Sequence, residues 1–230
     1  MAKLVWDTVG ERYYETGVKN VVLYPQVNGA YPTGVAWNGI TNVTQTPTGA
    51  DSNPIYADDI KYLDIRSVEE EEGSITAYTY PDEWAACDGS AALTTGVYIH
   101  QQPRQAFGLC YRTVLGNDTQ YENYGYKLHL IYGATASPSE KSHDTINDSP
   151  EAVEMSWDFT TVPVAVVDAN GQPLSGGYKN TSSIEIDSTK VDATKLAALE
   201  AILYGTDGTG SGTGTTARLP LPYEVLSTLS

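Results

Sequence analysis

Carboxylate groups are the side chains with the most evident chemical potential in this sequence. The 230 residues include 29 Asp and Glu against 13 Lys and Arg, which gives a formal net charge of −16. Two groupings are the most notable. One is the run of four consecutive glutamates Glu69, Glu70, Glu71 and Glu72, and the other is Glu154 with Asp158, on one face of an alternating segment. Carboxylates act as acids and bases, bind cations, or repel anions. Because so acidic a chain contains many chance pairs, we favour two interpretations: a solvated turn, or a surface that must not hold a polyanion.

No other pattern indicates an enzyme. His100, His129 and His143 lack the spacing of a metal site, and Cys87 and Cys110 form no Cys-x-x-Cys pair, so we expect reduced thiols. Residues 208–214 place Ser211 between glycines without matching Gly-x-Ser-x-Gly, and this Gly/Thr-rich run is unsuited to the rigid turn that a nucleophile needs. The Asp and Asn of residues 168–171 predict a β-turn, because the other ligands of a calcium loop are missing. We therefore expect no catalysis, metal or cofactor.

The overall charge argues against a protein that grips nucleic acid. Affinity for DNA or RNA backbones comes from Lys and Arg that displace counterions, and no such cluster occurs in this sequence of pI near 4.3. With 40% hydrophobic and 18% charged residues, the chain is expected to fold rather than to form an acidic tail. No apolar run approaches the roughly 18 residues that cross a bilayer, and the first residues lack a signal-peptide core, so we expect folding in a cytosol.

Alternating polar and apolar residues predict half-buried strands. The clearest case is residues 152–160, where one face would carry Val153, Met155, Trp157 and Phe159, and the other Glu154, Ser156, Asp158 and Thr160. Further strands are expected at residues 18–24, 34–40, 96–101, 106–115, 124–132, 162–168 and 181–187. The prediction is a mainly β fold, an antiparallel sandwich or barrel with one or two short helices.

Two segments predict projecting structure. Residues 62–69 and 74–80 are expected to form a long hairpin whose tip is Glu69–Gly73, with Gly73 supplying the positive φ of the turn. Residues 41–59 predict an arm, because loops longer than about 12 residues are usually functional or disordered. The arm contains Thr46, Pro47, Asp51, Asn53 and Pro54.

The end of the chain divides into three parts. A short helix is expected at residues 81–89, and a second helix, capped by Asp192, closes a body of residues 1–204. Residues 205–217 predict a flexible Gly/Thr linker, and residues 218–230 an apolar arm that either folds back on its own core or docks on a neighbour. That arm contains Arg218, Leu219, Leu221, Tyr223, Val225 and Leu226.

Several segments, taken in order, carry a more specific signal. They are QPRQAFGLCYRTVLGND at 102–118, GYKLHLIYGATASPSEKS at 125–142, TINDSPEA at 145–152 and SWDFTTVP at 156–163, with YPDEW at 80–84 and ARLPLPYEV at 217–225. Together they resemble the major tail proteins of bacteriophages with long, non-contractile tails. The resemblance covers nearly the whole chain, although the immunoglobulin-like surface domain that some members carry is not seen before Ser230.

The resemblance implies a tail tube protein of the virion, assembled in the host cytoplasm. It implies a β-sandwich whose copies form stacked hexameric rings, with an inner barrel through which the genome DNA passes. It also implies arms that reach between subunits or rings, and tape-measure, tail-terminator and baseplate proteins as partners.

We assign residues to these roles as expectations. The acids expected to face the lumen are Asp64, Glu69, Glu70, Glu71, Glu72, Glu154 and Asp158. The residues expected at contacts between subunits are those of the two arms named above. The alternative function is a carbohydrate-binding β-sandwich, an adhesin module, with Trp37, Trp84 and exposed tyrosines on its ligand platform.

Overall fold

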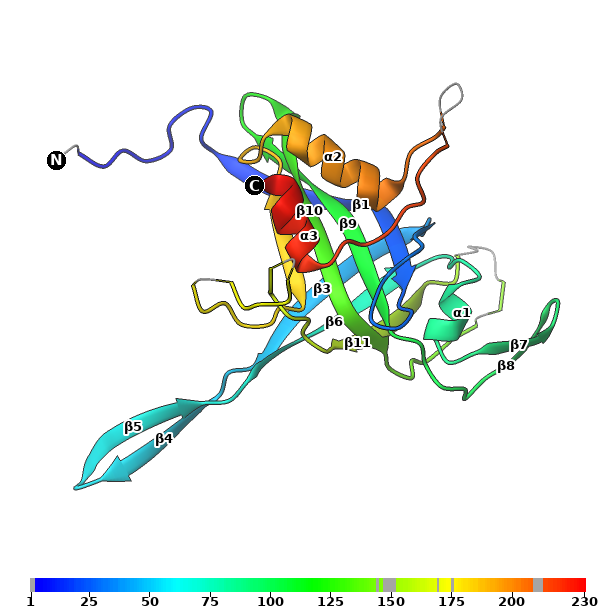
Figure 1. Ribbon diagram of the computed structural model, residues 1–230, viewed down its shortest axis with the longest axis horizontal. Helices are drawn as coiled ribbons and strands as arrows, with labels where there is room; N and C mark the ends of the chain where they lie inside the picture. The colour runs from blue at the N-terminus through cyan, green and yellow to red at the C-terminus, as the bar shows by residue number, and fades with distance from the viewer. Residues whose placement is uncertain (1–2, 144, 147–151, 169, 175, 209–212) are drawn as a thin grey trace.

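The structure, a computed structural model, describes residues 3–143, 145–146, 152–168, 170–174, 176–208 and 213–230. It confirms a mainly β fold built from antiparallel strands, with a few short helices (Figure 1). The large sheet has the order β2-β1-β9-β10-β11-β6-β3, and β12 pairs with β10 beside this path. Its strands are β1 (Tyr13–Pro25), β2 (Val35–Ala36), β3 (Ile40–Gly49), β6 (Glu69–Ala77), β9 (Phe107–Asn117), β10 (Tyr121–Ala136), β11 (Met155–Thr161) and β12 (Ser183–Asp187).

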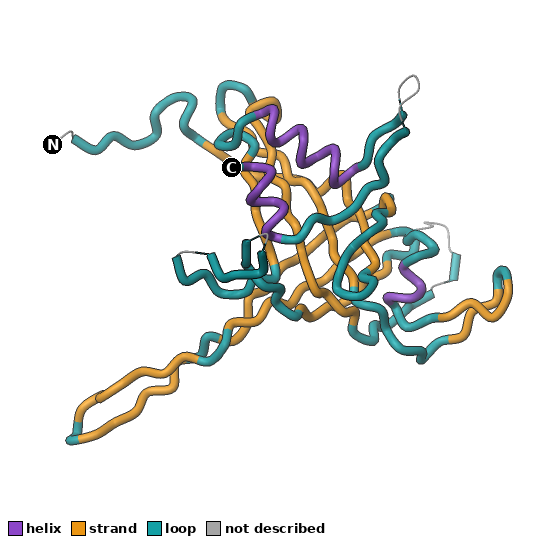
Figure 2. Tube along the Cα trace, in the orientation of Figure 1, coloured by secondary structure: helices purple, strands orange, loops and turns teal. Residues whose placement is uncertain are grey.

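Two further strand pairs project from the body. One consists of β4 (Ser52–Ala57) and β5 (Ile60–Arg66), and the other of β7 (Ala91–Thr94) and β8 (Val97–Ile99). Figure 2 shows both as orange pairs that extend away from the main sheet. The helices are α1 (Trp84–Cys87), α2 (Ala193–Tyr204) and α3 (Pro222–Leu229).

The large sheet folds over on itself and encloses two cores. Between its halves lies the sheet core, which includes Trp84, Trp157, Phe107 and Phe159. On the other side of β1, β9 and β10, helices α2 and α3 cover the helix core, which includes Leu130 and Leu199 (Figure 1). Strands β9 and β10 are therefore buried on both faces over much of their length, which explains why Phe107–Tyr111 and Leu130–Ala134 are apolar runs rather than alternating.

Helix α2 begins and ends where the sequence predicts. The Asp192 carboxylate accepts hydrogen bonds from the backbone N–H groups of Thr194 (2.9 Å) and Lys195 (3.1 Å), and Gly205 ends the helix with a φ of 75°. The shorter helix is confirmed only in part, because four residues, Trp84–Cys87, form α1. Its role is to place Trp84 in the sheet core.

The predicted hairpin is longer than expected and has a different tip. Strand β3 pairs with β6, and β4 pairs with β5, so residues 40–77 form one long ribbon that turns at Asp58 and Asp59. The acidic run Glu69–Glu72 lies in β6, not at a turn. Gly73 is also inside β6, where a Cβ atom would lie 2.5 Å from the Phe159 ring and still closer to the Thr44 carbonyl oxygen. The glycine is therefore explained by close packing rather than by a positive φ.

Three other strand predictions were too long or wrong. Residues 34–40 contain only the two-residue strand β2 and the first residue of β3, and residues 96–101 contain only β8. Residues 162–168 form no strand, although Val164 and Val167 make isolated bridges to Thr181 and Pro173. Beyond them, the Asp168 carboxylate accepts hydrogen bonds from the backbone N–H groups of Asn170 and Gln172, as expected for the predicted β-turn. Ala169 lies outside the described residues.

The expected linker and C-terminal arm have more structure than predicted. Thr206 and Thr215 form a two-way backbone bridge, while residues 209–212 of the linker lie outside the described residues. After the bridge the chain returns to its own body, and α3 packs beside α2 (Figure 1).

Candidate functional site

One face of the half-sheet β3-β6-β11 is polar throughout and uncovered. The antiparallel register places Thr44 beside Ser74, and Ser74 beside Asp158. Residues directly opposite one another share a face, so the whole set follows from the pairing. We call this the polar face, and its residues are Asn42, Thr44, Thr46, Thr48, Glu70, Glu72, Ser74, Thr76, Ser156, Asp158 and Thr160.

The opposite face of the same strands is buried, which fixes the direction of the polar face. Val43, Ile75 and Trp157 occupy neighbouring register positions and pack in the sheet core. Because side chains alternate along a strand, a slip of one residue would bury Asp158 and expose Trp157. The alternation predicted for residues 152–160 is confirmed for Met155–Thr160, whereas Val153 lies before β11 and is 39% exposed.

The polar face has acids but no cation. Strands β3, β6 and β11 contain no Lys, Arg or His at any position. Glu70, Glu72 and Asp158 are exposed on the face, and Glu154 lies just before β11, where its carboxylate accepts a 2.5 Å hydrogen bond from the Thr41 hydroxyl. The structure therefore brings together four of the seven acids that the sequence singled out.

The other three acids lie elsewhere. Asp64 belongs to β5 of the projecting ribbon, where hydrogen bonds from Ser52 and Lys61 lower the pKa of its carboxyl below the ordinary value. Glu71 lies on the buried side of β6 and accepts a hydrogen bond from the Gln45 amide, whose oxygen accepts one from Tyr111 (2.5 Å). Glu69 alternates in step with Glu71 and shares its side. Their assignment to one common surface with Asp158 was wrong: strand alternation separates Glu69 and Glu71 from it, and Asp64 lies on the projecting ribbon.

The ribbon β4–β5 carries apolar side chains on both of its faces, with no covering layer in the described chain. Its exposed apolar residues are Ile55, Tyr56, Ile60, Tyr62, Leu63 and Ile65, and Tyr62 is 69% exposed. A two-stranded ribbon is marginally stable in water by itself. The predicted arm of residues 41–59 is thus one strand of this ribbon and its base: Thr46 and Pro47 lie in β3, Asp51 at the junction, and Asn53 and Pro54 in β4.

The C-terminal residues predicted at contacts with neighbours lie largely in the chain's own core. Leu219 and Val225 are each 2% exposed in the helix core, and Leu221 packs against it. Arg218 pairs with Glu224 at 2.6 Å within the segment. Among the six, Leu226 is exposed and Tyr223 half-buried. The docking role of Leu219 and Val225 was wrong, because burial of apolar side chains in their own subunit removes them from any outer surface, whereas Leu221 is only partly buried.

A network of charged groups near the end of the sheet core was not predicted. Lys127 forms ion pairs of 2.9 Å with both Glu15 and Glu185, from β1 and β12. His129 stacks on Tyr111 with the rings 4.5 Å apart, and its Nε2 lies 2.9 Å from the Thr113 hydroxyl. No local spacing could reveal this group, because four separate strands, β1, β9, β10 and β12, supply it.

The environment of this network shifts the pKa values of its members. Burial lowers the pKa of His129 below its ordinary value near 6.5, against the opposing effect of Glu15 and Glu185. Burial alone would raise the pKa of Glu15, but hydrogen bonds from Thr113 and Lys127 lower it. Hydrogen bonds to Glu185 and Glu15 raise the pKa of Lys127. The network is therefore a compact set of compensated charges between strands.

The described residues hold two free cysteines but no cluster of metal-ligating side chains. They contain no group of three His, Cys, Asp or Glu side chains that could hold a metal ion. Cys87 and Cys110 are free and buried, and burial raises the pKa of each thiol to about 12. A thiol with so high a pKa is a poor nucleophile at neutral pH. In the part of the chain that the structure describes, no helix has the length and apolar character needed to cross a membrane.

The aromatic residues proposed as a carbohydrate platform are in the core. Trp37 and Trp84 are almost fully buried, and their rings lie 4.6 Å apart beside Trp157. This burial corrects the expectation that they line a ligand platform.

Comparisons with known proteins add no identification. Neither the protein-family models nor the curated proteins gave a match to this chain. The polar face and the ribbon therefore carry the functional argument.

Proposed function

We propose that this chain is a structural subunit that assembles with copies of itself into a hollow tube, the tail tube of a bacteriophage with a long, non-contractile tail. The polar face of β3, β6 and β11 would line the channel. The observation that carries the proposal is this face, which is exposed and acidic and whose strands contain no cation. The resemblance of residues 102–118 and the other segments to tail proteins gives the proposed tube its biological setting.

A channel wide enough for DNA requires several copies. A barrel of about eight strands is filled by its own side chains, whereas roughly sixteen or more are needed to enclose water. The polar face spans three strands, and β3 ends the sheet order. An unpaired edge strand invites pairing with another chain, and ring closure satisfies such edges. Stacked hexameric rings of this chain would provide both the strand number and the closure.

The chemistry of the polar face suits passage without binding. Proteins hold DNA through Lys and Arg, whose contacts with phosphates are strong and salt-dependent. Carboxylates such as Glu70, Glu72 and Asp158 instead repel phosphates over a Debye length of about 8 Å at physiological salt. The Thr and Ser hydroxyls between them keep the surface hydrated. A genome would slide past such a wall.

The ribbon β4–β5 supports assembly by a separate argument. Its apolar side chains face water on both sides in the isolated subunit, and burial against a neighbouring copy would remove them from water. The tape-measure, tail-terminator and baseplate proteins would meet the finished tube rather than the single subunit. The proposed location is the virion, after assembly in the host cytoplasm.

Electron microscopy of the purified full chain after concentration tests the proposal. We expect tubes with a stain-filled channel. The double variant Ile60→Ser/Tyr62→Ser in the ribbon should stay unassembled while its far-ultraviolet circular dichroism stays unchanged. A matched control, Leu93→Ser/Val97→Ser on the other projecting strand pair, alters the same kind of exposed residue at a different place. A wild-type chain that stays monomeric at every concentration would contradict the proposed function.

A further inference from the structure

The first described residues, 3–9, form a segment whose apolar side chains are largely exposed. Residues 3–9 lead away from the body at the end of the sheet where β1 begins (Figure 1). Leu4, Val5, Trp6 and Val9 are each more than 70% exposed, and Trp6 is 73% exposed. Burial of Trp6, together with Leu4 and Val5, against another apolar surface would therefore be strongly favourable.

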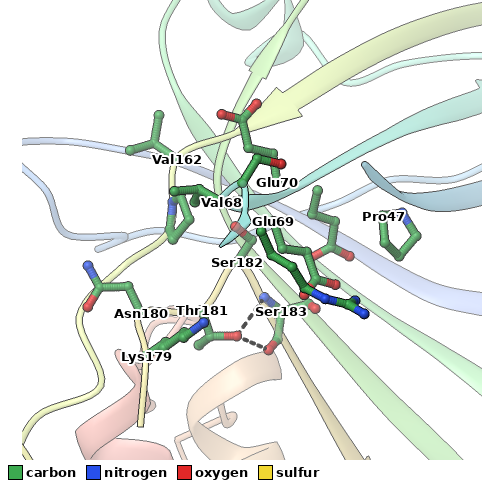
Figure 3. Close-up of a pocket in the computed structure, with 14 residues that line it drawn as sticks. Pro47, Val68, Glu69, Glu70, Val162, Lys179, Asn180, Thr181, Ser182 and Ser183 are labelled. Carbon is green, nitrogen blue, oxygen red and sulfur yellow. Dashed lines mark hydrogen bonds between the residues drawn. The ribbon is translucent and has the colours of Figure 1, made fainter. Parts of the chain in front are cut away.

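A groove of about 800 Å³ lies at the base of the ribbon, away from this segment. Figure 3 shows the residues that line it. Val68, Glu69 and Glu70 come from the base of the ribbon, and Val162 and Lys179 come from a later part of the chain. Val68 is 78% and Val162 70% exposed, so the groove presents apolar surface. Its charged lining residues are three glutamates, Glu69–Glu71, and two cations, Arg66 and Lys179. It is large enough for several side chains.

The segment and groove of one copy cannot meet. Gly10 is anchored at the far end of β9, where its N–H donates to Asp118 (2.9 Å) and its carbonyl accepts from Asn117 (3.0 Å). The groove extends as far as Ser183 of β12. Ser183 pairs with Ile131 of β10, which pairs with Leu109 of β9, and Leu109 lies eight residues before Asn117 on that strand. That separation is about 27 Å along the strand alone, at roughly 3.4 Å per residue.

The six residues from Gly10 to Leu4 span at most about 21 Å when fully extended. The apolar side chains of the segment therefore cannot reach the groove of their own subunit. A second copy of the chain has no such restriction.

We propose that residues 3–9 of one copy lie in the groove at the base of the ribbon of a second copy. Apolar side chains, above all Trp6, would cover Val68 and Val162. Lys3 would meet the carboxylate of Glu69, which lines the groove and lies off the polar face; this matters in a chain whose net charge of −16 otherwise opposes contact between copies. This inference rests on the proposed function and deepens it, because it names one contact between subunits of the tube.

The placement of the two surfaces predicts open growth. Unless two copies exchange their segments reciprocally, which would close a dimer, a segment at one end of the molecule that fits a groove elsewhere makes a head-to-tail contact. Such a contact repeats along a ring or a filament instead of closing a dimer. Each added copy presents a new segment and a new groove.

Photo-crosslinking of the assembled full chain tests the inference. Trp6 is replaced by a photoreactive phenylalanine analogue, and isotope-labelled and unlabelled chains are mixed before assembly. We expect crosslinks that join the two isotopic forms and that map to residues 66–71, 162–163 or 179–183. The same probe at Tyr98, an exposed residue on β8, is the control and should not reach these peptides. The variant Trp6→Ser should raise the critical concentration for assembly by roughly tenfold or more, as expected for a buried aromatic anchor.

The outcomes separate this inference from the function on which it rests. Tubes that form with the Trp6 probe crosslinked elsewhere, or only within one copy, would overturn the groove assignment and leave the tube proposal standing. A wild-type chain that never associates would overturn both. Crosslinks to the groove together with normal assembly of Trp6→Ser would show a proximity without binding energy, and would also overturn the inference.

Discussion

The Tyr132 hydroxyl donates a buried 2.9 Å hydrogen bond to the carbonyl oxygen of Pro220, across 88 residues of sequence. Tyr132 lies in β10 and is buried in the helix core, and Pro220 lies between Leu219 and helix α3. The backbone of Leu219 also bridges to Tyr31. The C-terminal segment is therefore a structural part of the subunit, and its truncation would expose the helix core rather than free an arm.

The variant Leu219→Ala should destabilise the subunit by about 2–5 kcal/mol, because a fully buried leucine is lost and a cavity is left. Leu226→Ala, the same substitution seven residues further on, should cost well under half as much, since Leu226 is 42% exposed. Urea denaturation of both variants measures the difference in the free energy of unfolding. Equal, small effects would show that residues 218–230 do not belong to the core.

The variant Gly73→Ala should destabilise the fold by about 1–3 kcal/mol, the usual cost of overpacking. The added methyl group would meet the Phe159 ring and the Thr44 carbonyl inside the sheet. The control is Ser74→Ala on the adjacent polar face, where surface substitutions stay within about 0.5 kcal/mol. Thermal unfolding of the two variants separates them. A stable Gly73→Ala protein would favour the turn that the sequence alone suggested.

The imidazole of His129 should titrate below pH 6.5, because burial among β-strands disfavours its charged form. Glu185→Gln should lower this pKa further, since Glu185 favours the protonated ring, and Lys127→Met should raise it. Nuclear magnetic resonance of the ring proton follows the titration directly. A rise in the Glu185→Gln variant would contradict the described network.

The same shift has a consequence for stability. A folded-state pKa below the unfolded value means that the unfolded chain binds the proton more readily. The stability contributed by neutral His129 is therefore present above pH 6.5 and is lost as the pH falls toward the folded-state pKa. The variant His129→Gln should show a flatter dependence of the urea midpoint on pH in this range.

The double variant Glu72→Lys/Asp158→Lys should make assembled tubes retain DNA. Each lysine placed on the polar face can neutralise one phosphate, and each such contact contributes about −0.9 to the slope of log affinity against log salt. The control is Asp82→Lys/Glu83→Lys, which makes the same change of charge at exposed residues before α1. Filter binding at several salt concentrations measures the effect. Equal retention of DNA by both variants would show that the polar face is not the lumen wall.

Local sequence determined the faces of the strands, through alternation, and the ends of the longer helix, through capping. Trp157 points inward and Asp158 outward because a strand has a period of two, and Asp192 caps α2 because its carboxylate meets the next free N–H groups. These features depend on neighbours within a few residues. A mainly β fold with an acid-bearing exposed face followed from them.

The tertiary structure decided which strands pair and what they bury. The acids Glu69–Glu72 look like a turn in sequence but form a strand, because β3 pairs along them and Gly73 fits beneath Phe159. Leu219 and Val225 look like a free apolar tail until the helix core is in place to receive them. Lys127 meets Glu15 and Glu185 only when three distant strands share a sheet. Such pairings depend on contacts between residues far apart in the chain, whose free energies no short window of sequence contains.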